Sequence, residues 1–212
     1  MNFNWVKTNR LIKKVFKKLI WDIPNSDNKI FLTFDDGPIP EVTEWVLDLL
    51  KNEEIKATFF CIGDNIQKHP SIYNRIVLEG HQIGNHTFNH LNGWKTNRAD
   101  YIANIKLCDT EQLKLQTEHS ILFRPPYGKI RTRQSKRIRR LGYKIIMWDV
   151  LSYDFAATVS PEACLKNVIS NTAQGSIIVF HDSLKAEKNI KYALPKAIQF
   201  LKSKGFVFDV IS

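Results

Sequence analysis

Short apolar runs alternate along this chain with longer segments in which apolar residues recur every three or four positions. The short runs are typical of buried strands, and the periodic segments are typical of amphipathic helices. We expect strands at 30–34, 57–61, 82–84, 121–123, 143–147, 176–180 and 206–210. We expect helices at 41–51, 71–78, 98–117, 132–141, 161–171 and 190–204.

Turn-forming residues lie between these segments where such a pattern requires them. Ser160 and Pro161 suit the N-cap and first position of a helix, and glycines suited to helix C-caps precede four strands, at Gly80, Gly142, Gly175 and Gly205. Strict alternation of strands and helices predicts a parallel sheet covered by helices. We therefore expect an irregular, incompletely closed (β/α)7-type barrel, formed as a single domain by residues 29–212.

Residues 1–28 carry a rough amphipathic pattern rich in lysine and predict an additional N-terminal helix. The longest apolar run there, Leu19-Ile20-Trp21, is too short for a signal-peptide core or a membrane span. We expect this helix to pack on the domain surface or on a membrane interface. A cytoplasmic or membrane-peripheral location is favoured, and the compartment stays open.

The net charge of +10 is unevenly distributed. Residues 1–20 and 129–140 hold thirteen basic residues and no acid, so the rest of the chain carries −3. Such stripes are most often solvated helix faces, and the alternative is attraction to a polyanion or an anionic membrane. No base-reading or stacking features accompany them, so we expect no nucleic-acid partner.

The composition is that of a globular protein, with 43% hydrophobic residues and 212 residues in all. The three cysteines are widely spaced and form no CxxC pattern, which indicates neither a disulfide framework nor a cysteine-ligated zinc. Cys61 lies in an apolar run, where we expect a buried free thiol.

Candidate metal ligands follow the first and third expected strands. Asp35 and Asp36 follow the first, and His86 and His90 follow the third. Two histidines four apart would share one face of a helical turn. Together with one carboxylate they would give a divalent metal three protein ligands and leave a position open, which is typical of a catalytic site. Zinc is the default for this ligand set, although other divalent ions fit it.

Other polar residues also follow the carboxyl ends of different strands. In a β/α barrel those ends share one face, where active sites are built. We therefore expect side chains far apart in the sequence to converge there, namely Asp35, Asp36, His86, Arg124, Asp149, Asp154 and His181.

Five segments resemble, in order and spacing, the motifs of the polysaccharide deacetylases, carbohydrate esterase family 4 with the NodB-homology domain. They are 33–38 (TFDDGP), 86–90 (HTFNH), 124–128 (RPPYG), 148–155 and 178–182, and the resemblance extends over residues 29–210. It implies that Asp35 is the general base, that Asp36, His86 and His90 bind the metal, and that metal-bound water is the nucleophile.

The same resemblance implies roles for residues around the metal. Arg124 would hold the base, the backbone N–H of Tyr127 would stabilise the oxyanion, and His181 would act as general acid. Val179 stands where the family has a leucine that lines the acetyl pocket. We also assign to the substrate pocket Pro126, Trp148 and Phe155, the last of which replaces a pocket tryptophan.

The fourth motif departs from the family pattern Asp-Ser-x-Asp-Trp, since this chain reads Leu151-Ser152-Tyr153-Asp154-Phe155. Leu151 cannot pair with a charged imidazole, so His181 loses one cause of a raised pKa. Asp149 would point to the same side as Leu151 on an extended strand. Either Asp149 or Asp154 is then a candidate partner of His181.

These features predict a monomeric, metal-dependent hydrolase that removes N-acetyl groups from a glycan containing N-acetylglucosamine. Peptidoglycan, a chitin-like oligomer and a glycolipid precursor are candidate substrates. Three alternatives remain: an O-acetyl esterase, a catalytically impaired glycan-binding protein of the same fold, and a protein whose basic stripes bind nucleic acid or a membrane surface.

Overall fold

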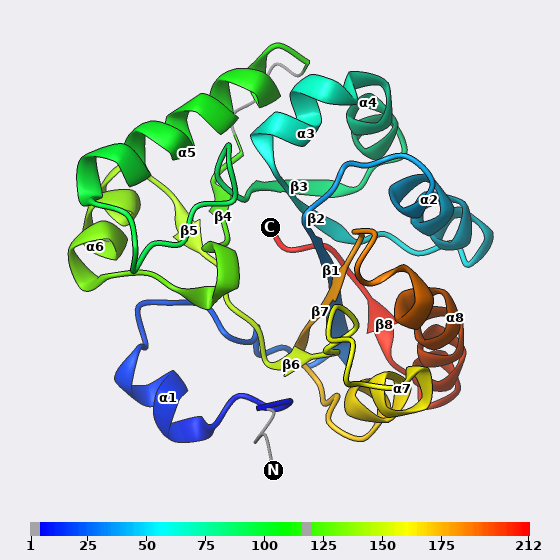
Figure 1. The fold of residues 1–212 in the computed structure, drawn as a ribbon. Helices are drawn as coiled ribbons and strands as arrows, with labels where there is room; N and C mark the ends of the chain where they lie inside the picture. Colours follow the sequence, from blue (N-terminus) through cyan, green and yellow to red (C-terminus); the bar gives the residue numbers. More distant parts are fainter. Residues whose placement is uncertain (1–4, 116–119) are drawn as a thin grey trace.

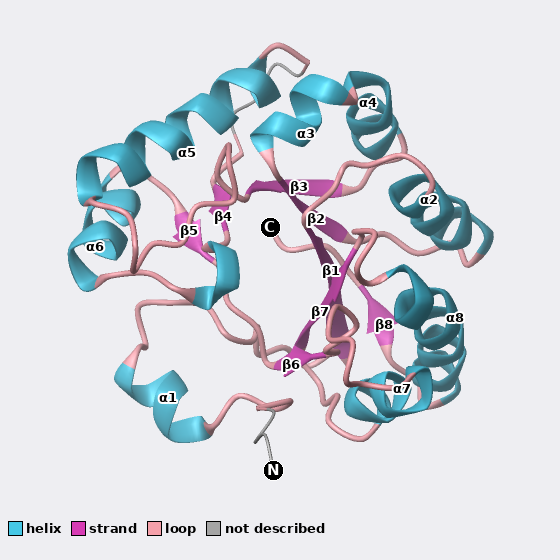
Figure 2. Ribbon diagram, in the orientation of Figure 1, coloured by secondary structure: helices cyan, strands magenta, loops and turns pink. Residues whose placement is uncertain are grey.

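The computed structural model describes residues 5–115 and 120–212, so the end of the helix predicted at 98–117 lies partly outside the described residues. Parallel strands curl into an open barrel with helices on its outer surface (Figures 1 and 2). The fold class predicted from the alternation is confirmed. None of the described helices is long and apolar enough to cross a lipid bilayer.

The sheet has the strand order β5-β4-β3-β2-β1-β7-β6, with β8 paired to β1 outside this path. All of the pairings between these strands are parallel. The seven predicted strands are present, and a short strand within the segment 148–155, β6, is additional. The bounds are β1 Lys29–Asp35, β2 Thr58–Cys61, β3 Gln82–Asn85, β4 Leu122–Phe123, β5 Lys144–Ile145, β6 Val150–Leu151, β7 Ile177–His181 and β8 Val207–Phe208.

The predicted helices of the barrel are also present, and one short helix, α3, was not predicted. Ser160 caps α7 as expected, because its hydroxyl accepts a hydrogen bond from the Ala163 N–H at 3.2 Å. The bounds are α1 Arg10–Val15, α2 Val42–Asn52, α3 Gly63–Lys68, α4 Pro70–Leu78, α5 Arg98–Leu113, α6 Thr132–Arg140, α7 Pro161–Ile169 and α8 Glu187–Ser203, with a 3₁₀ turn η1 at Pro126–Gly128.

The central strands are buried on both faces, which is why they read as continuous apolar runs. Cys61 is buried with a free thiol, as expected. In the register of β1 and β7, Asp35 is the partner of His181. The parallel arrangement therefore brings two polar residues, 146 positions apart in the sequence, to the same end of the sheet.

The N-terminal segment covers the gap between β5 and β6. From residue 5 onward it is helical only in α1, a shorter span than the sequence predicted. Its backbone pairs with both sides of the gap, since Ile20 bridges to Ile146 and Lys7 bridges to Val150. Figure 1 shows α1 on the outside of this gap, between α6 and α7. The segment thus supplies pairing that the sheet lacks at its open edge.

A buried carboxylate anchors this segment. Asp149 accepts hydrogen bonds from Lys7 Nζ at 2.5 Å, Lys13 Nζ at 2.5 Å and Ser176 Oγ at 2.6 Å. Burial raises the pKa of Asp149, but the hydrogen bonds from Lys13, Lys7 and Ser176 lower it more, so the pKa lies below its usual value. The stabilisation is therefore present at neutral pH and is lost as the pH falls below about 4.

We expect Asp149→Asn to lower the free energy of unfolding by about 2 kcal/mol, because two lysines lose their shared counter-charge. Urea denaturation at pH 7 measures this change. Asp48→Asn is the matched control: it removes an exposed ion pair with Arg75 and should change stability by less than about 0.5 kcal/mol. Equal stability of the two variants would contradict the anchoring role of Asp149.

Candidate active site

A cavity of about 680 Å³ opens at the carboxyl ends of the strands, where the sequence predicted that polar residues converge. Predicted site residues that line it are Asp35, Asp36, His86, His90, Tyr127, Trp148, Phe155, Val179 and His181. Arg124 is fully buried behind this wall. Asp149, Asp154 and Pro126 do not line the cavity.

Asp36, His86 and His90 bring one ligand atom each to within 4.8 Å of one another. Asp36 Oδ1 lies 3.2 Å from His90 Nε2 and 3.8 Å from His86 Nε2. Burial lowers the pKa of His86 to about 4 and also lowers the pKa of His90. Both imidazoles are therefore neutral at pH 7, the form that binds a metal.

The two histidines lie in a loop after β3, so the predicted helical turn is wrong. Thr87 and His90 have φ of 63° and 53°, a left-handed backbone that no regular helix contains. The side chain of Asn104, on α5, accepts hydrogen bonds from the N–H groups of Phe88 and Asn89 at 2.9 Å each. This loop brings the imidazole centroids to 5.1 Å from each other.

A contact at Nδ1 fixes the orientation of each of the two imidazole rings. The Arg124 carbonyl accepts a hydrogen bond from His86 Nδ1 at 2.8 Å. Because a carbonyl only accepts, the proton of His86 resides on Nδ1 and the lone pair of Nε2 faces Asp36. The Tyr127 hydroxyl lies 3.1 Å from His90 Nδ1 and orients the second ring.

The loop that carries Asp36 is clamped by Asp182, to which the sequence gave no role. Asp182 accepts hydrogen bonds from the Gly37 N–H at 3.0 Å and from the Thr43 hydroxyl at 2.7 Å. A Cβ at Gly37 would lie 1.9 Å from the Asp182 carboxylate, so only glycine fits there. Asn65 donates to the Asp36 carbonyl at 2.7 Å.

Asp35 forms a buried ion pair with Arg124, whose Nη1 donates to Asp35 Oδ1 at 2.6 Å. Burial raises the pKa of Asp35, but the positive charge of Arg124, together with His86 and His181, lowers it more. The net shift is downward, so the carboxylate is ionised at neutral pH. An oriented, ionised carboxylate at the cavity wall is chemically able to accept a proton.

His181 pairs with Asp154, which resolves the choice between the two aspartates. Its Nδ1 lies 2.8 Å from Asp154 Oδ1, and its backbone N–H donates to Asp154 Oδ2 at 2.6 Å. Burial lowers the pKa of His181, but the negative charge of Asp154 raises it more, with smaller contributions from Asp36 and Asp35, to about 9. Asp149 is wrong as the partner of His181.

The segment 124–128 reaches the cavity surface at Tyr127. Pro126 is buried, helps to form η1 and is not among the residues that line the cavity, so its assignment to the pocket stays a prediction. Tyr127 has a φ of 60° and is 59% exposed at the cavity mouth. Its side chain contacts His90, in addition to the backbone position that the motif suggested.

Apolar side chains form much of the cavity wall. Phe155 packs edge-on against the His181 ring, with centroids 4.7 Å apart. Leu151, which breaks the family motif, lines the cavity beside Val179. Lining residues that the sequence did not single out for the pocket are Ile39, Ile62, Asn65, Lys129, Tyr153, Ser183, Leu184 and Lys185. Most of them follow the carboxyl end of a strand, and that position is the feature by which the sequence could have identified them.

Comparison with known proteins agrees with this geometry. A family model described as polysaccharide deacetylase matches residues 22–146. A peptidoglycan-N-acetylglucosamine deacetylase from Bacillus cereus is 34% identical over 91% of this chain and 90% of its own length. The chain therefore belongs to the polysaccharide deacetylase family, as the five motifs indicated, and is a hydrolase of amide C–N bonds.

Solved structures extend the comparison. The crystal structure of the Bc1960 peptidoglycan N-acetylglucosamine deacetylase superposes with a TM-score of 0.88 at 35% identity, covering 96% of this chain and 95% of that one. A mutant of BA3943, described as a family pseudoenzyme with restored activity, gives a TM-score of 0.81 at 26% identity over 91% of this chain and 69% of that one. The fold alone therefore does not guarantee turnover, and individual site residues decide it.

We expect Asp154→Asn to lower the pKa of His181 well below about 9, because the main cause that raises it is lost and only the smaller contributions of Asp36 and Asp35 oppose burial. Nuclear magnetic resonance titration of the His181 ring protons, assigned with His181→Ala, measures the midpoint. In the unmodified protein it should lie near 9. Asp149→Asn is the control and should leave that midpoint in place. A midpoint that moves with Asp149 and not with Asp154 would reverse the assignment.

Proposed function

We propose that this protein removes N-acetyl groups from N-acetylglucosamine residues of peptidoglycan, with a divalent metal, zinc by preference, held by Asp36, His86 and His90. The observation that carries the proposal is the position of an ionised carboxylate, Asp35, and a protonated imidazole, His181, as register partners on adjacent strands beside this triad. Such a pair serves both proton transfers of amide hydrolysis.

The triad fits a metal ion on the chemistry of its donors. Asp36 Oδ1 is buried and has no hydrogen-bond partner among the described residues, although a buried carboxylate oxygen is costly to leave unpaired. Two neutral imidazoles and one carboxylate are a ligand set that zinc accepts with a position left open. A bound divalent ion would supply positive charge that polarises the acetyl carbonyl and lowers the pKa of a water molecule.

The protein's own groups then move the protons. Asp35 accepts a proton from the attacking water, and Arg124 keeps the carboxylate ionised and correctly oriented. His181, held protonated by Asp154, donates a proton to the sugar nitrogen as the C–N bond breaks. The products are acetate and a free amine. The backbone N–H of Tyr127 is the proposed donor to the negatively charged oxygen that forms at the acetyl carbon.

The pocket wall suits a small apolar group next to a sugar. Val179 and Leu151 are both nearly inaccessible to solvent and contribute to the wall, which suits the methyl group of an acetyl substituent. Trp148 and Tyr127 offer aromatic surfaces to a sugar ring. The choice of peptidoglycan is supported by the activity in the names of the Bacillus cereus relative and of the Bc1960 structure.

The Asp154–His181 pair supports turnover over the catalytically impaired alternative. Leu151 removes the carboxylate that the family pattern places first, yet Asp154 supplies the charge that His181 requires. Acidic assistance to the leaving group favours an amide over an ester, because an amine is the poorer leaving group and must be protonated. O-acetyl esterase activity is distinguished from N-deacetylase activity by comparing acetate release from an ester-linked and an amide-linked substrate.

We expect the zinc-loaded protein to release acetate from peptidoglycan and from chitooligosaccharides faster than from acetylated xylan, as measured by enzymatic assay of acetate. Asp35→Asn should lower kcat on peptidoglycan by about a thousandfold, because the attacking water loses its proton acceptor. Arg75→Gln, which removes the ion pair with Asp48 away from the cavity, is the control and should retain full rate. Faster release from xylan would establish an esterase, and no release from any substrate would establish an inactive binding protein.

We expect His90→Ala to abolish stoichiometric zinc binding, since only two ligands of the triad remain. Native mass spectrometry of the metal-stripped protein after addition of one equivalent of zinc measures occupancy without reference to activity. His69→Ala is the control, because His69 lies outside the triad, and it should bind one ion per chain. Undiminished binding by the His90 variant would remove the triad as the metal site.

A further inference from the structure

The two basic runs of the sequence lie on the same side of the molecule. Figure 1 shows α1 next to α6. Leu19 and Trp21, which follow α1, pack on the same apolar cluster as Ile138 and Leu141 at α6. The tertiary structure therefore joins two stripes, more than a hundred residues apart in the sequence, into one surface, which we call the α1–α6 face.

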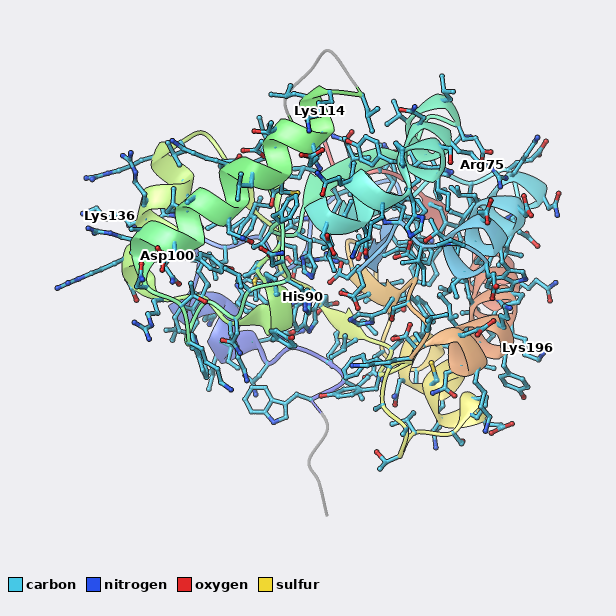
Figure 3. The ribbon with its side chains drawn as sticks, turned by 45° about the horizontal axis from the view of Figure 1, so that its top comes forward. Arg75, His90, Asp100, Lys114, Lys136 and Lys196 are labelled. Carbon is cyan, nitrogen blue, oxygen red and sulfur yellow. The ribbon has the colours of Figure 1, made fainter. Side chains whose placement is uncertain are left out.

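This face presents many cations without acidic partners. Eight exposed cations on this face form no ion pair with a described acidic side chain, namely Arg10, Lys14, Lys17, Lys18, Arg133, Lys136, Arg137 and Arg140. Figure 3 shows Lys136 extending outward into solvent. Because the remainder of the chain carries net negative charge, the positive potential is concentrated on this face.

Apolar side chains lie among these cations. Leu11, Val15 and Phe16 are 69%, 71% and 50% exposed, and α1 has no buried residue. Single exposed apolar residues are common on protein surfaces. Three of them on one short helix and its C-cap, with lysines on either side, form the pattern of a helix that lies in a membrane interface.

The position of α1 prevents these side chains from turning inward. Lys7 pairs with the backbone at Val150 before α1, and Ile20 pairs with Ile146 after it. Lys13, within α1, is bound to Asp149 and Asp22, so the helical segment is held against the barrel. The apolar side chains therefore point away from the core in the folded protein. Only a binding partner can remove these apolar side chains from contact with water.

We propose that the α1–α6 face docks this enzyme on an anionic lipid bilayer, with Leu11, Val15 and Phe16 entering the headgroup–acyl boundary and the cations of both helices contacting acidic headgroups. A soluble polyanion would match the charge but would leave the apolar side chains in water, so the lipid surface satisfies both features. None of the residues of α1 or α6 lines the catalytic cavity, so docking leaves the cavity wall free.

Sedimentation with lipid vesicles tests the proposal on the full chain. We expect binding to vesicles of phosphatidylglycerol and phosphatidylcholine, and none to phosphatidylcholine alone. Replacing Leu11, Val15 and Phe16 together by serine should weaken binding by about tenfold or more. The variant Arg133→Ser/Lys136→Ser/Arg137→Ser should weaken it to a similar degree, because each cation contributes near an anionic surface.

The matched control is Leu78→Ser/Leu107→Ser, which removes two exposed apolar side chains from other helices and should leave vesicle binding unchanged. All variants should release acetate from soluble chitooligosaccharides at the unmodified rate, a readout independent of the membrane. Absence of binding to the anionic vesicles overturns the proposal. It is equally overturned if the triple serine variant at α1 keeps full vesicle affinity and inorganic polyphosphate binds the face, since the face is then a polyanion site.

Discussion

The buried ion pair between Arg124 and Asp35 organises the barrel interior and the site together. Arg124 is the largest fully buried side chain among the described residues, and its guanidinium also donates to the Thr33 hydroxyl at 2.8 Å and to the Met147 carbonyl at 3.1 Å. A buried charge is tolerated only when it is paired and its donors are satisfied. One side chain therefore links β1, β4 and the segment after β5, and it fixes the proposed base at the cavity wall.

Environment gives the aspartates of this site different roles. Asp35 is held ionised by a buried guanidinium, and Asp154 raises the pKa of His181. Burial raises the pKa of Asp182 to about 7, against the opposing hydrogen bonds from Thr43 and Gly37, and this residue clamps the loop that carries Asp36. Partners and burial, more than residue type, separate a proton acceptor from a positioning group.

The open edge of the sheet explains why the backbone of the N-terminal segment pairs with the barrel. Unpaired backbone groups at a sheet edge are a liability, and here residues 6–8 and 20 pair with the chain on both sides of the gap. The Asp149 cluster holds that pairing in place. The same fixed geometry keeps α1 on the outside, with its apolar and basic side chains directed at solvent.

Most of the strands and helices, the barrel class and the three metal-ligand candidates could be predicted from the sequence, because these depend on local periodicity and on motifs whose spacing is short. The partner of His181 depends on tertiary structure. β6 runs parallel to β7, so Asp149 lies beside Ile177, four residues or about 13 Å before His181 at the usual rise of a strand, whereas Asp154 follows β6 and reaches the end where His181 lies. The loop geometry of His86 and His90, the burial of Pro126 and the union of the two basic stripes also depend on contacts between residues distant in the chain. A local pattern does not contain that information, since strand register and long-range packing select among conformations that the local sequence permits equally.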